Sequence, residues 1–305
     1  MPQDGLLIID KPSGLTSHDV VQHVRKALGT RRVGHGGTLD PDATGVLLVA
    51  AGQATRFFRF LSKDDKAYQG RIRLGFATDT RDASGRPLAE ECPRRPDRDA
   101  VLSAMKAFEG ETLQIPPRFS AKKIGGRPVY KRARAEEEFE LEPVRVRISR
   151  FALCAYAPPY IDFEAVCSAG TYIRSLAHDL GQELGCGAHL AVLRRTSVGC
   201  YGLDQAVALE AFEAAAARGE ASRFIRPLES LLPWAPVITV RRDAEVFVRN
   251  GRTLGPAELA GPCPGLDEPG SPRADVVRLL SSEGKLLALG RPSADGSLHP
   301  FLVIP

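Results

Sequence analysis

The chain has 305 residues, and 41 lysines and arginines against 37 acidic residues give it a formal net charge of +4. With 43% hydrophobic residues, 29 glycines and 23 prolines, it is too apolar for a disordered chain and too poor in Gly and Pro for a fibrous one. The length fits about two globular domains, and no apolar stretch approaches the ~20 residues that would cross a bilayer.

The six cysteines have no framework spacing, which favours free thiols in a reducing compartment and predicts a cytoplasmic protein without an export signal. Only Cys186 and His189 have a metal-like spacing, and no second ligand pair accompanies them. We therefore expect no metal site.

The N-terminal part of the chain predicts a strand, a helix and a glycine-rich loop. Residues 6–10 form a short run, apolar up to Asp10, that ends at a Lys-Pro-Ser-Gly turn, which is typical of a strand. Ser17 is a candidate N-cap for a helix with apolar residues at helical spacing up to Gly29. Residues 34–45 hold too many glycines for a regular element, and the apolar run 46–51 predicts a buried strand.

The middle of the chain has the pattern of antiparallel strands. Apolar residues between 68 and 76 alternate with polar and basic ones, which predicts a strand with one basic face. Residues 145–156 and 160–167 alternate around two prolines and predict a hairpin, and helical spacing returns at 173–184. The pattern indicates an α/β fold of the α+β kind, with a mixed, largely antiparallel sheet.

Prolines within residues 231–236 interrupt any regular element, and we place a domain boundary there. One domain then spans 1–233 and a second spans 234–305. Short apolar strands at 276–280 and 286–289 predict that the second domain is a small β-rich module.

Three interpretations compete for the loop at 34–45. A Walker-type phosphate loop needs Lys and then Ser or Thr after its last glycine, but Gly45 is followed by Val-Leu. A dinucleotide fingerprint should open a helix, whereas this segment leads into a strand. The third is a catalytic carboxylate at Asp40, although on residue chemistry alone a turn explains Asp40-Pro41 better.

Two stretches concentrate positive charge. Residues 118–134 contain seven lysines and arginines and no acidic residue. A second group comprises Arg56, Arg59, Lys63, Lys66, Arg71 and Arg73. If both shared a face they could neutralise nucleic-acid phosphates, but two separate solvated surfaces explain the pattern equally well.

Several motifs then occur in a fixed order. They are Leu-Leu-Ile-Ile-Asp-Lys-Pro-Ser-Gly-Leu-Thr-Ser at 6–17, Gly-His-Gly-Gly-Thr-Leu-Asp-Pro-Asp-Ala-Thr-Gly at 34–45, Lys-Ala-Tyr at 66–68, Gln-Ile-Pro-Pro-Arg-Phe-Ser-Ala-Lys at 114–122, Ser-Ala-Gly-Thr-Tyr-Ile-Arg-Ser-Leu at 168–176, and residues 184–195. Their order and spacing closely resemble those of the TruB family, the bacterial tRNA pseudouridine-55 synthases. The resemblance covers residues 5–235, with a weaker match beyond to the family's PUA-like RNA-binding module.

The resemblance implies that Asp40 is the nucleophile of an isomerase. Pseudouridine formation breaks the N1–C1′ bond of uridine and rejoins the base through C5, with no redox change. A carboxylate can stabilise or trap the positive charge that develops at the sugar, or remove a sugar proton, as carboxylates do in glycoside hydrolysis. The resemblance therefore implies neither a cofactor nor a metal.

The resemblance also assigns the residues around Asp40. Arg174 would form an ion pair that keeps the Asp40 carboxylate ionised. Tyr68 would lie against the uracil and is the candidate base for the C5 proton. Tyr172 and Leu193 would line the uridine pocket, and His35 would enter the RNA loop that the target base leaves when it turns out.

The resemblance places a tRNA-gripping insertion at about 118–140, with phosphate contacts and recognition by shape. The expected RNA-binding residues are Lys11, Arg118, Lys122, Lys123, Arg127 and Lys131. The expected partner is the T-arm of tRNA, with no obligatory protein partner and no membrane.

Two alternatives stay open. One is a dyskerin-type synthase that depends on a guide RNA and partner proteins, against which the basic insertion argues. The other is a non-catalytic tRNA-binding or RNA-folding protein with an abandoned site, against which the intact Asp40, Tyr68 and Arg174 argue.

Overall fold

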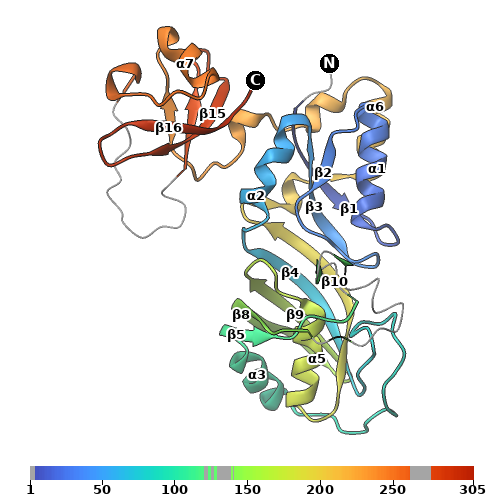
Figure 1. The fold of residues 1–305 in the computed structure, drawn as a ribbon. Helices are drawn as coiled ribbons and strands as arrows, with labels where there is room; N and C mark the ends of the chain where they lie inside the picture. Colours follow the sequence, from blue (N-terminus) through green and yellow to red (C-terminus); the bar gives the residue numbers. More distant parts are fainter. Residues whose placement is uncertain (1–3, 120–122, 125–126, 129–138, 140, 262–275) are drawn as a thin grey trace.

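The computed structural model describes residues 4–119, 123–124, 127–128, 139, 141–261 and 276–305. The described chain forms one large mixed sheet flanked by helices and a separate small sheet near the C-terminus (Figure 1). This confirms the predicted fold class. Among the described residues, no helix is both long and apolar enough to span a membrane.

The large sheet has ten strands among the described residues, with the main order β12-β1-β3-β10-β4-β9-β8-β5. Two short strands pair outside this path, β2 with β3 and β11 with β10. The strands are β1 (Gly5–Lys11), β2 (Val33–His35), β3 (Thr44–Ala51), β4 (Lys66–Leu74), β5 (Gly110–Gln114), β8 (Val144–Ala157), β9 (Tyr160–Cys167), β10 (Ala188–Val198), β11 (Tyr201–Gly202) and β12 (Val207–Ala208). The helices beside this sheet are α1 (Ser17–Leu28), α2 (Phe58–Leu61), α3 (Arg98–Ala107), α5 (Ile173–Glu183) and α6 (Leu209–Ala217).

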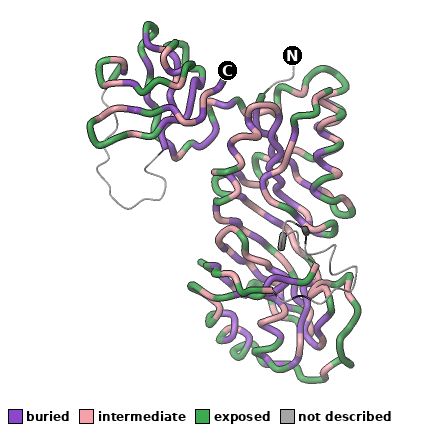
Figure 2. The backbone as a smooth tube through the Cα atoms, in the orientation of Figure 1, coloured by how far each residue is buried: buried purple, intermediate pink, exposed green. Residues whose placement is uncertain are grey.

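The N-terminal half of the sheet is buried on both faces. Residues Leu7, Ile9, Leu47 and Val49 of β1 and β3 pack under α1 and α6, while their neighbours Leu6, Ile8, Val46 and Leu48 face a second apolar cluster on the other side. Burial on both faces explains why residues 46–51 are continuously apolar rather than alternating. Figure 2 shows the resulting buried strands between exposed helix surfaces.

Helix α1 begins one residue earlier than a cap at Ser17 would imply. The N-cap is Thr16 rather than the expected Ser17, because the Thr16 side chain accepts from the Asp19 N–H and Asp19 accepts from the Thr16 N–H in return. The Ser17 hydroxyl instead turns inward, to the backbone of Leu39. Gly29 ends the helix in the left-handed region, as predicted.

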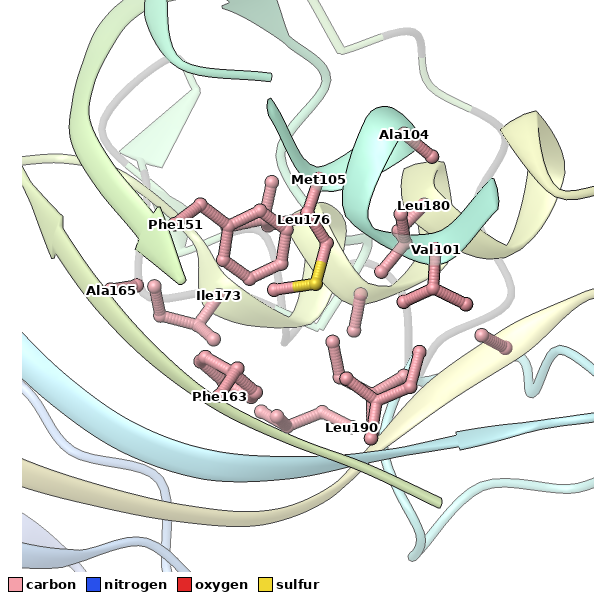
Figure 3. Close-up of a cluster of buried hydrophobic side chains, with 14 of the residues drawn as sticks. Val101, Ala104, Met105, Phe151, Phe163, Ala165, Ile173, Leu176, Leu180 and Leu190 are labelled. Atoms are coloured by element: carbon pink, nitrogen blue, oxygen red, sulfur yellow. The ribbon is translucent and has the colours of Figure 1, made fainter. Parts of the chain in front are cut away.

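The other half of the sheet is covered by helices on one face. The predicted hairpin is present as β8 and β9, which pair antiparallel. Helices α3 and α5 pack against these strands around Met105, Phe151, Phe163, Ile173 and Leu176 (Figure 3). The two halves meet where β10 pairs antiparallel with β4 and parallel with the start of β3.

The small C-terminal sheet has the order β13-β14-β15-β16. Its elements are β13 (Val237–Thr239), α7 (Glu245–Arg249), β14 (Val277–Leu280), β15 (Leu286–Pro292) and β16 (Leu298–Val303). Leu289, Leu302 and Ile304 share an apolar cluster with Leu6 and Ile8, so this sheet packs against the large one. The division at residue 233 stays a prediction.

Candidate functional site

The loop that carries Asp40 is fixed by contacts on either side of that residue. The Ser17 hydroxyl accepts from the Leu39 N–H at 2.8 Å and donates to the Leu39 carbonyl at 3.1 Å. At the far end, a Cβ on Gly45, whose φ is +102°, would lie 2.1 Å from the Arg195 carbonyl oxygen. Only glycine allows β3 and β10 to approach this closely.

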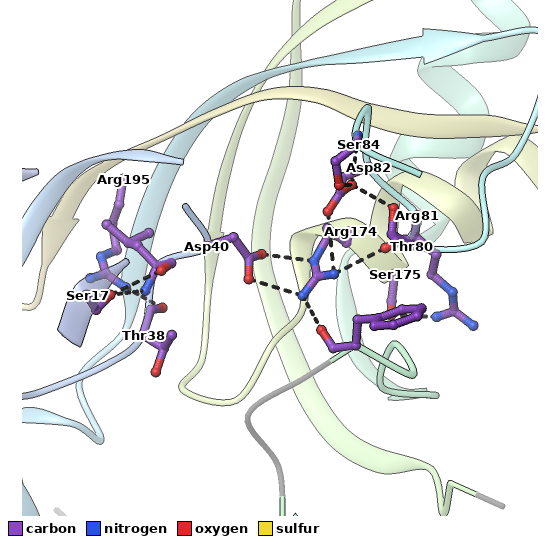
Figure 4. Close-up of polar contacts among 12 residues, drawn as sticks. Ser17, Thr38, Asp40, Thr80, Arg81, Asp82, Ser84, Arg174, Ser175 and Arg195 are labelled. Carbon is purple, nitrogen blue, oxygen red and sulfur yellow. Dashed lines mark hydrogen bonds and ion pairs between the residues drawn. The ribbon is translucent and has the colours of Figure 1, made fainter. Parts of the chain in front are cut away.

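Arg195 also holds this loop, through carbonyls before Asp40 and at the start of β3. Its side chain is among the largest fully buried ones, and its guanidinium donates to the carbonyls of Val46 at 2.7 Å, Gly37 at 3.2 Å and Thr38 at 3.5 Å. The segment therefore has a defined path despite its glycines. Figure 4 shows Arg195 on one side of the loop and Asp40 pointing away from it.

Asp40 forms a two-point ion pair with Arg174 at the start of α5. The Arg174 Nε lies 2.9 Å from Asp40 Oδ2, and its Nη2 donates to Asp40 Oδ1 at 3.2 Å. The Arg174 side chain is only 8% exposed, whereas the Asp40 side chain is 43% exposed. The carboxylate is thus anchored from behind and remains accessible.

The remaining donors of Arg174 are also occupied (Figure 4). Nη1 donates to the Thr80 carbonyl at 3.2 Å and lies 3.5 Å from Asp82 Oδ2. Nη2 also donates to the Phe119 carbonyl at 2.8 Å. The planar guanidinium is therefore held in one orientation, which two-point binding of a carboxylate requires.

The electrostatics of Asp40 differ from the simple expectation. Burial raises the pKa of the Asp40 carboxyl above its usual value, and Arg174 opposes this rise, with a smaller opposing contribution from Lys11. Asp82 adds to the rise because it is a second negative charge. Arg174 therefore offsets the cost of burying Asp40 rather than making it an unusually strong acid.

Tyr68 occupies β4 and is 8% exposed. Burial raises the pKa of its hydroxyl, and the neighbouring Arg195 partly opposes that shift. The hydroxyl is therefore protonated at neutral pH, and Tyr68 belongs to the same apolar cluster as Ile173 and Leu176 of α5.

The other expected pocket residues lie on elements around this centre. Tyr172 is the N-cap of α5, two positions before Arg174. Leu193 is half-buried on β10, pairs with Gly70 and packs against the cluster that contains Tyr68. His35 ends β2, and burial lowers the pKa of its imidazole, with Arg195 contributing in the same direction.

Lys11 differs from its expected role as an RNA contact. It is 0% exposed, and its ammonium donates to the carbonyls of Pro12, Leu15 and Pro41 at 2.6–2.9 Å. Burial lowers its pKa to about 8. A phosphate cannot reach this group, so Lys11 braces the Asp40 loop instead, a placement that its charge alone did not reveal.

The expected basic insertion is described only in part. Arg118 is exposed, with its guanidinium 5.1 Å from the centre of the Phe139 ring. Lys123 and Arg127 lie on the short paired strands β6 (Lys123–Ile124) and β7 (Arg127–Pro128). Lys122 and Lys131 lie outside the described residues.

The second basic group is not a continuous cationic surface. Lys66 is 7% exposed and donates to the carbonyls of Ser62 and Asp64. Arg71 pairs with Asp162, and Arg73 pairs with Glu91. The lysines and arginines of this group are close in sequence, but burial or an acidic partner removes Lys66, Arg71 and Arg73 from a shared positive surface.

Sequence reasoning missed two charged residues of the site, Asp82 and Arg195. Asp82 accepts from Thr80 and Ser84 and so presents its carboxylate to Arg174, but it lies outside the motifs that the chain shares with the TruB family. Arg195 lies within one of the family motifs, but the motif does not indicate that its guanidinium is buried rather than on the surface. Among the described residues, no group of three or more His, Cys, Asp or Glu could hold a metal ion.

Comparison with known proteins gives consistent matches. The model of the TruB family pseudouridylate synthase N-terminal domain matches residues 25–173, and that of the tRNA pseudouridylate synthase B C-terminal domain matches residues 174–233. The tRNA pseudouridine synthase B of Solibacter usitatus is 40% identical over 301 residues, covering 99% of this chain and all of the relative. That of Opitutus terrae is 48% identical over 212 residues, covering 69% of this chain and 88% of the relative.

Solved structures extend the comparison. A chain in an H/ACA RNP bound to a substrate RNA containing 2'-deoxyuridine superposes with a TM-score of 0.73 at 26% identity, covering 99% of this chain and 85% of that one. A chain in a Cbf5-Nop10-Gar1 complex gives the same TM-score at 27% identity, with the same coverage of both chains. With two family models and near-complete coverage by a 40% identical relative, the chain belongs to the TruB family of pseudouridylate synthases.

Proposed function

We propose that the protein is a tRNA pseudouridine synthase, an isomerase that converts uridine 55 of the T-loop to pseudouridine with Asp40 as its nucleophile. The observation that carries this proposal is the two-point Arg174–Asp40 ion pair, which presents an accessible carboxylate from a fixed loop. The near-complete match to tRNA pseudouridine synthase B of Solibacter usitatus supports tRNA as the substrate.

The chemistry can be assigned to groups of this chain. N1 of the uracil leaves C1′, C5 takes its place, the C5 proton is lost and N1 gains a proton, so atoms balance without a redox partner. The charged form of Asp40, which Arg174 favours against the effect of burial, meets the positive charge at the sugar. Arg174 keeps the carboxylate oriented, which saves reorganisation during the reaction.

Tyr68 and its neighbours would hold the base. The buried ring of Tyr68 offers a flat apolar surface for uracil, with Tyr172 and Leu193 lining the pocket. Because its raised pKa keeps the hydroxyl protonated, Tyr68 can accept the C5 proton only as it releases its own. His35, neutral at physiological pH, would fill the space left in the RNA when the uridine turns out.

The proposed RNA contacts are Arg118 and, within the insertion, Lys122, Lys123, Arg127 and Lys131. The four-stranded C-terminal sheet is proposed as a PUA-like RNA-binding module of the domain at 234–305. The protein would act in the cytoplasm without an obligatory protein partner, and the free thiols of the described cysteines suit a reducing compartment.

The guide-dependent alternative has one observation in its favour, the structural match to chains of H/ACA and Cbf5 complexes. That match has 26–27% identity, against 40% for tRNA pseudouridine synthase B over a similar span. The stand-alone tRNA enzyme is therefore the better supported function.

A minimal T-arm hairpin separates these possibilities. If folded shape is what the protein recognises, the hairpin should be modified at the uridine equivalent to position 55, and the same nucleotides in an unstructured strand should not. Equal modification of the unstructured strand, or a hairpin that reacts only after guide RNA or a partner protein is added, would contradict the proposal.

A further inference from the structure

Residues 114–119 run alongside the first turn of α5. Their first contact joins the side-chain amide of Gln114 to the backbone of Tyr172. The Tyr172 N–H donates to Gln114 Oε1 at 2.8 Å, and Gln114 Nε2 donates to the Tyr172 carbonyl at 3.0 Å. One amide thus pairs with both polar groups of one residue, as a neighbouring strand would.

Two further contacts tie the same segment to α5. The Ser175 hydroxyl, fully buried, donates to the Ile115 carbonyl at 2.8 Å, and Arg81 donates to that same carbonyl at 2.9 Å. The Phe119 carbonyl accepts from Arg174 at 2.8 Å. Along its length the segment therefore contacts Tyr172, Ser175 and Arg174, and Figure 4 shows Arg174 and Ser175 close together at this helix start.

The Gln114 contact holds the backbone of the residue that begins α5. Tyr172 is the N-cap of α5 with extended backbone angles of −101° and 108°, and no side chain of its own caps the helix. Gln114 is 2% exposed, so neither of its hydrogen bonds can be replaced readily by water. Rotating the Tyr172 peptide would therefore take the Tyr172 N–H and both groups of the buried Gln114 amide away from these partners.

We propose that Gln114 is a positioning residue for pseudouridine formation, a role that rests on the function proposed above. It fixes the backbone of Tyr172 in the uridine pocket and, two residues further on, the direction from which Arg174 meets Asp40. Gln114 itself contacts no reacting atom. Its loss should therefore slow the chemical step and leave RNA binding nearly unchanged.

The test compares Gln114→Met with a matched control, Gln69→Met. Methionine keeps the length of the side chain and removes both hydrogen bonds to Tyr172. Gln69 is exposed on β4 and makes one side-chain hydrogen bond, to Glu164 at 3.1 Å. With unmodified tRNA, kcat of Gln114→Met should fall about 10- to 100-fold, the scale of a displacement near 1 Å, with KM within about twofold. The control should match the wild type in both constants.

Hydrogen exchange gives a readout that does not depend on turnover. The Tyr172 amide should exchange faster in Gln114→Met than in the wild type and in Gln69→Met, because its acceptor has gone. Unchanged kcat in a folded Gln114→Met protein, or a raised KM with unchanged kcat, would overturn the proposal. A wild type that makes no pseudouridine would refute the proposed function, while amide exchange would still report the contact with Tyr172.

A second variant covers the case in which Gln114→Met does not fold. Ser175→Ala removes the hydroxyl that donates to the Ile115 carbonyl of the same segment and accepts from Arg81 at 2.7 Å. Its kcat should fall about three- to tenfold with unchanged KM, the scale of one or two lost hydrogen bonds. Wild-type kcat in Ser175→Ala, together with failure of Gln114→Met to fold, would assign the segment to stability alone and overturn the positioning role.

Discussion

Replacing Arg174 by lysine tests whether the reaction at Asp40 needs the two-point contact of the guanidinium, and not only its positive charge. The guanidinium contacts Asp40 at 2.9 and 3.2 Å and also reaches Asp82 and the carbonyls of Thr80 and Phe119. Lysine keeps the positive charge but carries its three donors on one atom, so it cannot reproduce both contacts with the carboxylate and the others at once.

The cost follows from the contacts that are lost. One hydrogen bond to a charged group contributes about 1.5–3 kcal/mol. Because the Asp40 side chain is 43% exposed, water screens part of this, and we take the lower end, about 1.5–2 kcal/mol. Expressed as transition-state stabilisation, that is a single-turnover rate about 10- to 30-fold slower.

The assay is release of tritium from C5 of uridine in tRNA at saturating enzyme. The matched control is Arg71→Lys, because Arg71 makes the same two-point contact with Asp162, at 2.6 and 2.9 Å, on an exposed part of β4. The control should stay within about twofold of the wild-type rate, since exposed pairs contribute little. A wild-type rate for Arg174→Lys, or an equal loss in both variants, would refute the reasoning.

Three further predictions concern the base, the buried lysine and the insertion. Tyr68→Phe should bind tRNA as the wild type does but release C5 tritium far more slowly, and an unchanged rate would remove the hydroxyl from proton transfer. Because burial lowers the pKa of Lys11 from 10.5 to about 8, the unfolded chain binds more protons between those pH values, so stability should rise with pH across that window. Denaturant unfolding of Lys11→Met should lack this rise, and an identical pH profile would contradict the assignment. The last variant replaces four basic residues of the insertion by Ala, namely Lys122, Lys123, Arg127 and Lys131. It should bind tRNA more weakly, with a smaller dependence of affinity on salt, because fewer counterions are displaced. An unchanged slope of log affinity against log salt would place these residues away from the RNA.

The local pattern of apolar and polar residues predicts strands well where buried and exposed positions alternate along the chain. On β9, Ile161, Phe163, Ala165 and Cys167 are buried while their neighbours are not, and this period of two is visible in the sequence. The cap of α1 was misplaced by one residue because Thr16 and Ser17 are both good caps, and only the reciprocal contact with Asp19 decides between them.

Long-range contacts were beyond local pattern. Asp40 and Arg174 are 134 positions apart, and only the resemblance to a known family brought them together before the structure did. The parallel pairing of β3 with β10 involves just Thr44 and Gly45, too short a contact to leave a periodic signal.

A charged side chain in the sequence does not always lie on the surface of this protein. Lys11 and Lys66 are cations in the sequence, but both are buried and donate to backbone carbonyls. Asp82 reaches the site through a turn closed by Thr80 and Ser84, in a segment with no recognised motif. Such residues become visible only when the fold shows what each charge contacts.

The most direct test of the central claim is to incubate the protein alone with an unmodified tRNA transcript and map pseudouridine along it, with Asp40→Asn in parallel. We expect one new pseudouridine, at position 55, with the wild type, and none with Asp40→Asn, although the variant should bind tRNA about as well because little volume changes. Modification by Asp40→Asn at a comparable rate, or a wild type that binds tRNA and leaves position 55 unmodified, would contradict the account.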